Sequence, residues 1–109
     1  MLLVSLLFIG TSSEDGIAAS ELSGEWFCIH EKGEYRTTRG IKIVGSSLIE
    51  TGGFGTRQVI KDAAISEEYV FWNNGNIQEF EFFPLQNKLI ETARVSGSIT
   101  VLEYKCKTR

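Results

Sequence analysis

The sequence is poor in the residues on which most enzyme and metal sites depend. Its 109 residues include one histidine, His30, and two cysteines, Cys28 and Cys106. A hydrolase triad needs a base beside its nucleophile, and a zinc site needs several Cys or His ligands at short spacing. We therefore expect no catalytic residues, no metal and no cofactor, and we predict that the chain is not an enzyme.

The sequence also lacks the motifs and the charge that nucleotide or nucleic-acid binding requires. The stretch GGFGTR has no Lys-Ser or Lys-Thr to contact phosphate and metal. With 11 basic and 14 acidic residues the net charge is −3, so no basic surface for nucleic acid is expected. Glu79 and Glu81 share one face of a predicted strand, where solvent-exposed charge is the usual interpretation.

Long apolar runs are absent after the first nine residues, MLLVSLLFI. Nine residues span roughly 14 Å as a helix, about half of a bilayer core, so no transmembrane span is predicted. The run has the length of a signal-peptide core, and the small residues before Ser20 suit cleavage. We expect residues 1–20 to be a signal peptide or a disordered segment of a secreted or periplasmic protein, with a buried N-terminal element as the alternative.

The two cysteines lie near the two ends of the remaining chain. In an exported domain, residues 21–109, such a pair is typical of a disulfide between Cys28 and Cys106. The bond would close a loop of 106 − 28 = 78 residues, which the loop-entropy model values at roughly 4 kcal/mol. Two buried free thiols are the alternative.

With one proline and 11 glycines, the rest of the chain has the pattern of short strands and tight turns. EWFCIHE and GIKIVG alternate between two faces, and TRQVIKDAAI is interpreted as a strand followed by a turn. EEYVFW and IQEFEFF flank NNGN, a sequence typical of a hairpin turn. Two more strands, 89–95 and 99–106, are predicted around Ser96-Gly97-Ser98.

These strands and turns predict an all-β domain. Seven or eight short strands with frequent turns indicate an antiparallel sandwich or barrel. Because the disulfide would join the first and last strands, we predict a small antiparallel barrel closed by that bond. Its aromatic residues are expected to fill the interior, and a cavity for a small apolar ligand is the alternative.

Two short stretches resemble known families. LSGEWF, with Gly24 and Trp26, is similar to the Gly-x-Trp motif of lipocalin-like barrels. EYVFWNNGN, residues 68–76, resembles the YxFWxKG segment of bacterial C-type lysozyme inhibitors, which are small exported barrels with an early and a late cysteine. In that family the Lys of this motif and an upstream Ser-Gly enter the lysozyme active site. Here the Lys position is Asn74, and Arg57 is the candidate cation.

We therefore expect an exported, non-catalytic binding protein that engages a protein partner through barrel loops, with a lysozyme or another envelope enzyme as the candidate partner. The expected contact residues are Arg57, Trp72, Asn73, Asn74 and Gly75. Gly52, Gly53 and Gly55 are interpreted as a flexible turn, with a mobile binding loop as the alternative. A lipocalin-like carrier of a small apolar ligand is the alternative function.

Overall fold

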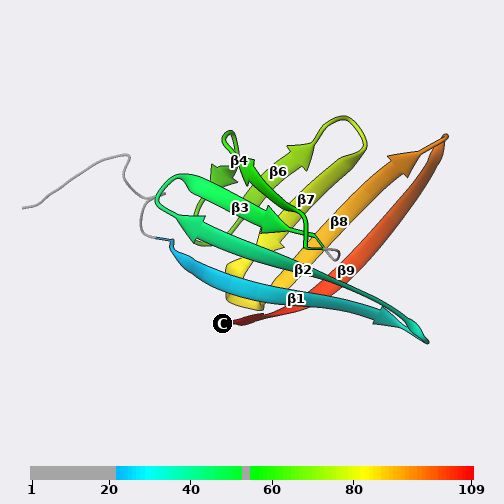
Figure 1. Cartoon of the computed structure of the whole chain (residues 1–109), viewed down its shortest axis with the longest axis horizontal. Helices are drawn as coiled ribbons and strands as arrows, with labels where there is room; N and C mark the ends of the chain where they lie inside the picture. The colour runs from blue at the N-terminus through cyan, green and yellow to red at the C-terminus, as the bar shows by residue number, and fades with distance from the viewer. Residues whose placement is uncertain (1–21, 53–54) are drawn as a thin grey trace, which may run out of the picture.

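The fold is a single antiparallel sheet of nine strands in a computed structural model that describes residues 22–52 and 55–109 (Figure 1). The predicted signal segment, residues 1–20, and Gly53 of the predicted glycine turn lie outside the described residues. In chain order, the elements of the described part are β1 (Gly24–Lys32), β2 (Tyr35–Val44), β3 (Ser47–Thr51), β4 (Arg57–Ile60), β5 (Ala64–Ile65), β6 (Val70–Asn74), β7 (Gln78–Phe83), the short 3-10 helix η2 (Pro84–Gln86), β8 (Lys88–Val95) and β9 (Ser98–Thr108).

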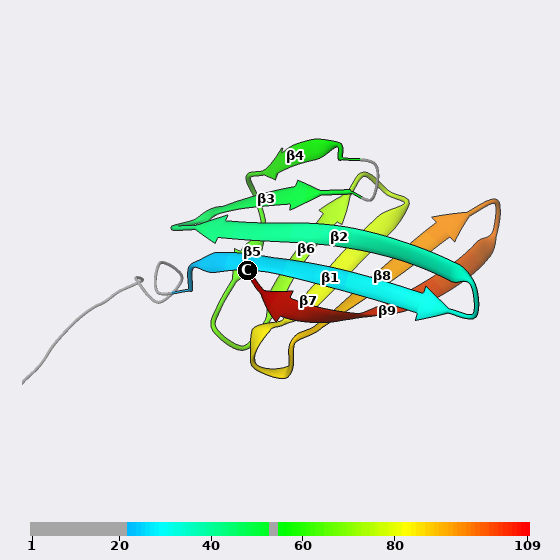
Figure 2. The same ribbon diagram turned by 60° about the horizontal axis from the view of Figure 1, so that its bottom comes forward.

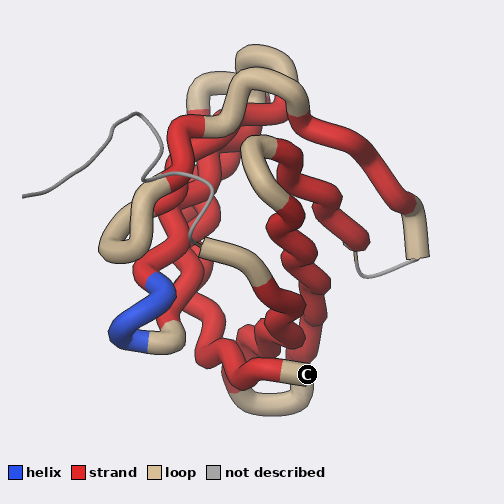
Figure 3. The backbone as a smooth tube through the Cα atoms, turned by 90° about the vertical axis from the view of Figure 1, so that its left-hand side faces the viewer, coloured by secondary structure: helices blue, strands red, loops and turns tan. Residues whose placement is uncertain are grey.

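The all-β, antiparallel prediction is confirmed, but the predicted strand number and the closed barrel are wrong. The sheet order is β4-β3-β2-β1-β9-β8-β7-β6-β5, so β4 and β5 are two edges with no backbone pairing between them. These strands have four and two residues, too few to form a long ladder of hydrogen bonds. The nine strands together form a curled, open half-barrel (Figure 3). Its two edge strands are short and therefore present little unpaired backbone.

The predicted disulfide is confirmed, and it joins the first strand to the last. Cys28 and Cys106 face each other directly in the β1–β9 ladder, and both are buried. The two ends of the described chain therefore meet in the middle of the sheet, where β1 lies between β2 and β9. The open side consequently falls in the middle of the sequence, between β4 and β5.

The β1–β9 pairing is short, because the β1–β2 and β8–β9 hairpins diverge beyond it (Figure 1). Only Trp26–Ile29 pair with Lys105–Thr108. His30 lies at this fork, with its Nδ1 2.8 Å from the carbonyl oxygen of Glu103. Because a carbonyl oxygen only accepts, Nδ1 is the donor. The single histidine thus occupies a structural position in the sheet.

The inner face of the half-barrel holds the core, as the alternation of the strands predicts. Trp72 stacks on Phe80 at 5.1 Å, and Trp26 meets Phe82 edge-on at 5.1 Å. The predicted β6–β7 hairpin pairs Val70 with Phe82 and reverses at residues 75–77. Five aromatic side chains therefore contribute to the interior, those of Trp26, Trp72, Phe80, Phe82 and Tyr104. No helix in residues 22–52 and 55–109 is long and apolar enough to span a membrane.

Candidate functional site

The structure brings two of the predicted contact segments together at one end of the half-barrel. Arg57 and Gln58 open β4, and Asn74 ends β6 just before Gly75 in the turn. The side-chain amides of Gln58 and Asn74 exchange two hydrogen bonds, of 3.4 and 3.1 Å. We call Arg57, Gln58, Asn74 and Gly75 the rim. These side-chain amides link β4 to β6. No backbone ladder joins these two strands, which Figure 2 shows as separate ribbons.

The predicted contact residues that flank the rim have different surroundings. Asn73 is exposed on the outer face of β6. Trp72 is only 1% exposed, and its indole Nε1 donates a 3.2 Å hydrogen bond to Glu50. A partner at the surface cannot reach the Trp72 ring. This residue contributes to the core, because it alternates inward with Val70 on the same strand.

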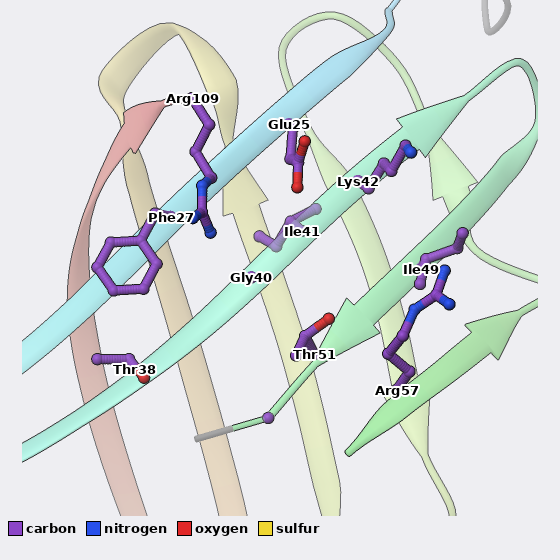
Figure 4. Close-up of a pocket in the computed structure, with 11 residues that line it drawn as sticks. Glu25, Phe27, Thr38, Gly40, Ile41, Lys42, Ile49, Thr51, Arg57 and Arg109 are labelled. Carbon is purple, nitrogen blue, oxygen red and sulfur yellow. The ribbon is translucent and has the colours of Figure 1, made fainter. Parts of the chain in front are cut away.

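A hollow of about 300 Å³ lies on the outer face of β1–β4 and includes Arg57 in its wall (Figure 4). A single cross-strand row forms its centre: Phe27 faces Gly40, Gly40 faces Thr51, and Thr51 faces Arg57. Gly40 contributes no side chain, so the backbone of β2 is uncovered between Phe27 and Arg57. The hollow thus exists because one position of a four-strand row is a glycine.

Most of the charged side chains around this hollow are cations. Lys42, Arg57 and Arg109 line it together with a single carboxylate, Glu25. The guanidinium of Arg109 lies 5.3 Å from the centre of the Phe27 ring. The ion pairs found within the described residues involve other cations, namely Arg36, Arg39 and Arg94. Phe27 also lines two neighbouring hollows with Lys107, so positive charge continues onto β9.

A second polar cluster lies inside the half-barrel, around Arg39 of β2. Its guanidinium pairs with Glu50 of β3 and with Glu91 of β8, at 3.1 and 3.3 Å for Glu91. Both carboxylates are buried, at 3% and 5% exposure. The Cζ of Arg39 also lies 4.7 Å above the Phe80 ring. A single cation thus bridges carboxylates from the two halves of the sheet.

The two carboxylates have different additional donors. Glu91 accepts hydrogen bonds from Tyr104 at 2.6 Å and from Gln78 at 2.8 Å, whereas Glu50 accepts one from Trp72. Burial raises the pKa of Glu50 above its ordinary value, and the attraction of Arg39 only partly offsets this. Burial acts in the same direction on Glu91, but hydrogen bonds from Tyr104 and Arg39 outweigh it and lower the pKa.

The same contacts act on the donors. Burial and the hydrogen bond to Glu91 raise the pKa of the Tyr104 hydroxyl. For Arg39, burial alone would lower the pKa, but the bond to Glu91 raises it, so the guanidinium stays charged. Each group of the cluster is paired and hydrogen-bonded in the core. This arrangement ties β2 and β3 to β8.

The interior cluster was not predicted from the sequence, although the sequence contains a signal for it. The tetrapeptide Leu-Ile-Glu-Thr occurs twice, at residues 48–51 and 89–92. In both copies the Leu and the Glu are buried on the inner face, and both glutamates bind Arg39. A glutamate that alternates with a buried leucine on a strand is therefore the signal that indicates an inward-facing carboxylate here.

No protein-family model, curated protein or solved structure matches the chain.

Proposed function

We propose that the chain is an exported, non-catalytic binding protein that engages a protein partner through the rim. The observation that carries the proposal is the pair of hydrogen bonds between Gln58 and Asn74. These hydrogen bonds bring β4, which carries the candidate cation Arg57, beside residues 68–76, the segment that resembles the lysozyme-inhibitor motif. Function on a rigid β scaffold is commonly presented by such loops and strand ends.

The disulfide supports the compartment in this proposal. Cys28 and Cys106 are oxidised and buried in the structure, and disulfides form and persist in secreted and periplasmic proteins. A cross-link of this kind also keeps the half-barrel rigid. A rigid scaffold loses little conformational entropy when its loops bind a partner.

The specific partner we propose is a lysozyme. The resemblance of residues 68–76 to the lysozyme-inhibitor segment supports this choice, and Asn74 takes the position of the family's Lys. Arg57 is exposed and precedes Gln58, the partner of Asn74, in β4. Its side chain lies on the outer face of that strand, so a cation is present on the strand beside the motif. An arginine suits an enzyme cleft that contains two carboxylates, because its guanidinium can bind a carboxylate through two hydrogen bonds.

The test is lysozyme turnover measured with and without the purified protein at micromolar concentration. We expect inhibition, and we expect Arg57→Ala to weaken it at least tenfold, since a hydrogen bond to a charged group is worth about 1.5–3 kcal/mol. Lys32→Ala removes an exposed cation at the far end of the β1–β2 hairpin and serves as the control. Unchanged turnover with the wild-type protein would exclude the lysozyme form of the proposal.

A further inference from the structure

Gly40 occupies a position that the fold itself does not require to be glycine. It lies within β2, where its partners Phe27 and Thr51 continue an unbroken register on both sides. Its φ is not in the left-handed region. A Cβ at this position would lie 3.4 Å from the Cβ of Thr51 and 4.0 Å from the carbonyl oxygen of Trp26, which are ordinary contacts. A glycine in a strand interior weakens the strand, and it often marks a place where a ligand approaches the backbone.

The charged side chains that line the hollow give this surface a positive charge. Arg109 and Arg57 extend from opposite sides of the hollow, with Gly40 and Thr51 between them (Figure 4). Lys42 supplies a third cation, against the one carboxylate of Glu25. The three positive and one negative side chains give 3 − 1 = +2 around the hollow. The whole chain, in contrast, carries −3, so this surface has the opposite sign.

The remaining lining groups suit an organic molecule better than a bare ion. Phe27 and Ile49 offer apolar contact, and the hydroxyls of Thr38 and Thr51 offer hydrogen bonds. A volume of about 300 Å³ lies at the lower end of the range for small-molecule sites, which combine apolar walls with a few fixed polar groups.

We propose that the hollow over Gly40 binds a small organic anion. Its acidic oxygens lie between Arg57 and Arg109, and its carbon skeleton packs against Phe27 and Ile49. Arginine suits this role because its planar guanidinium matches the oxygens of a carboxylate or a phosphate. The site lies on the outer face of β1–β4 and shares Arg57 with the rim, whereas Phe27, Gly40 and Arg109 lie outside the rim. Benzoate binding is measured on the free chain without lysozyme, so the failure of one proposal does not imply the failure of the other.

The test follows the backbone amide resonances of the full chain by NMR during titration with benzoate, benzamide and inorganic phosphate. Benzoate and benzamide have nearly the same size and shape but differ in charge. We expect saturable shifts at Gly40, Thr51 and Phe27 with benzoate at millimolar concentration, at least tenfold weaker binding of benzamide, and weakening of the benzoate affinity by added salt. Equal binding of benzoate and benzamide, or no shifts at these residues, would overturn the proposal.

Phosphate and a set of variants separate the parts of the proposed site. Phosphate binding as tight as that of benzoate would overturn the role of Phe27 and Ile49.

Arg57→Gln and Arg109→Gln should each reduce benzoate affinity at least fivefold. Arg94→Gln removes a cation that pairs with Glu79 elsewhere on the outer face and should leave the affinity unchanged. Benzoate affinity that is the same in all three variants would contradict the site. Gly40→Ala should also weaken binding by covering the floor of the hollow.

Discussion

At the scale of single residues, Arg39 shows how one charge sets the chemistry of the interior. Its guanidinium lies between Glu50 and Glu91, so three charged groups share a region from which water is largely excluded. Removing one member of a buried ion pair leaves an uncompensated charge and typically costs about 3–5 kcal/mol. Glu91 accepts additional hydrogen bonds from Tyr104 and Gln78. The two carboxylates therefore differ in pKa, although each is the glutamate of a Leu-Ile-Glu-Thr tetrapeptide.

This inequality predicts opposite contributions of the two glutamates to acid stability. Folding lowers the pKa of Glu91, so its stabilising contribution is present above the ordinary value of 4.5 and is lost as the pH falls through the folded pKa. Folding raises the pKa of Glu50, so its contribution is full below 4.5 and is lost as the pH rises through the folded pKa. A tenfold difference in proton affinity between the folded and unfolded chain corresponds to about 1.4 kcal/mol of stability.

The measurement is the free energy of unfolding in urea from neutral pH to about pH 3. The difference between wild type and Glu91→Gln should shrink as the pH falls. The difference between wild type and Glu50→Gln should change in the opposite direction, which makes this variant the matched control. Parallel pH profiles for the two differences would show that the two carboxylates titrate alike and would contradict the assignment.

At the scale of elements, the local sequence pattern determines the strands and the hairpin turns, but not the number of strands or the open seam. NNGN and Ser96-Gly97 lie where hairpins reverse, and the structure has both hairpins. Alternation within each strand also indicates which face is buried. Whether β4 pairs with β5 depends on contacts between distant segments, such as Gln58 with Asn74 and Trp72 with Glu50. No local pattern specifies these contacts.

The candidate sites could likewise be predicted only where local sequence determines them. Arg57 and Asn74 could be selected from a motif and a nearby cation, and the fold brings their segments together. The hollow over Gly40 could not be predicted, because it depends on β1–β4 being aligned so that Phe27, Gly40 and Thr51 form one row. Buried glutamates were missed because a carboxylate in a strand usually faces solvent. Only a partner such as Arg39, brought in by a different strand, makes its burial favourable.

The amide pair of the rim predicts a local effect on the edge strand. Asn74→Ala removes both hydrogen bonds to Gln58, which link β4 to β6 where no backbone ladder does. We expect the amides of β4 to exchange hydrogen several-fold faster, because local opening becomes easier, with a loss of about 0.5–1.5 kcal/mol per hydrogen bond at most. Asn73→Ala, an exposed neighbour on the same strand, is the control. The same exchange rates in both variants would show that the pair does not hold β4.

At the scale of the whole molecule, the disulfide determines which part of the sheet is continuous and which part is open. Cys28 and Cys106 join β1 to β9 in the middle of the sheet, so the two hairpin systems, β1–β4 and β5–β9, become one curled surface. The β1–β9 ladder beside the bond contains only four residue pairs. A junction with so few backbone pairs depends on the cross-link to stay closed when the chain fluctuates.

The disulfide is therefore expected to contribute a large share of the stability. The bond closes a loop with a sequence separation of 78, and removal of a native disulfide from a small domain costs about 2–5 kcal/mol. Cys28→Ala combined with Cys106→Ala should lower the free energy of unfolding in urea by this amount. Reduced wild-type protein, which retains both sulfur atoms in the core, separates loss of the cross-link from loss of packing. If reduction alone changes stability by less than about 1 kcal/mol, the β1–β9 junction holds without the bond, and the divergent hairpins must be supported by Arg39 and its two glutamates instead.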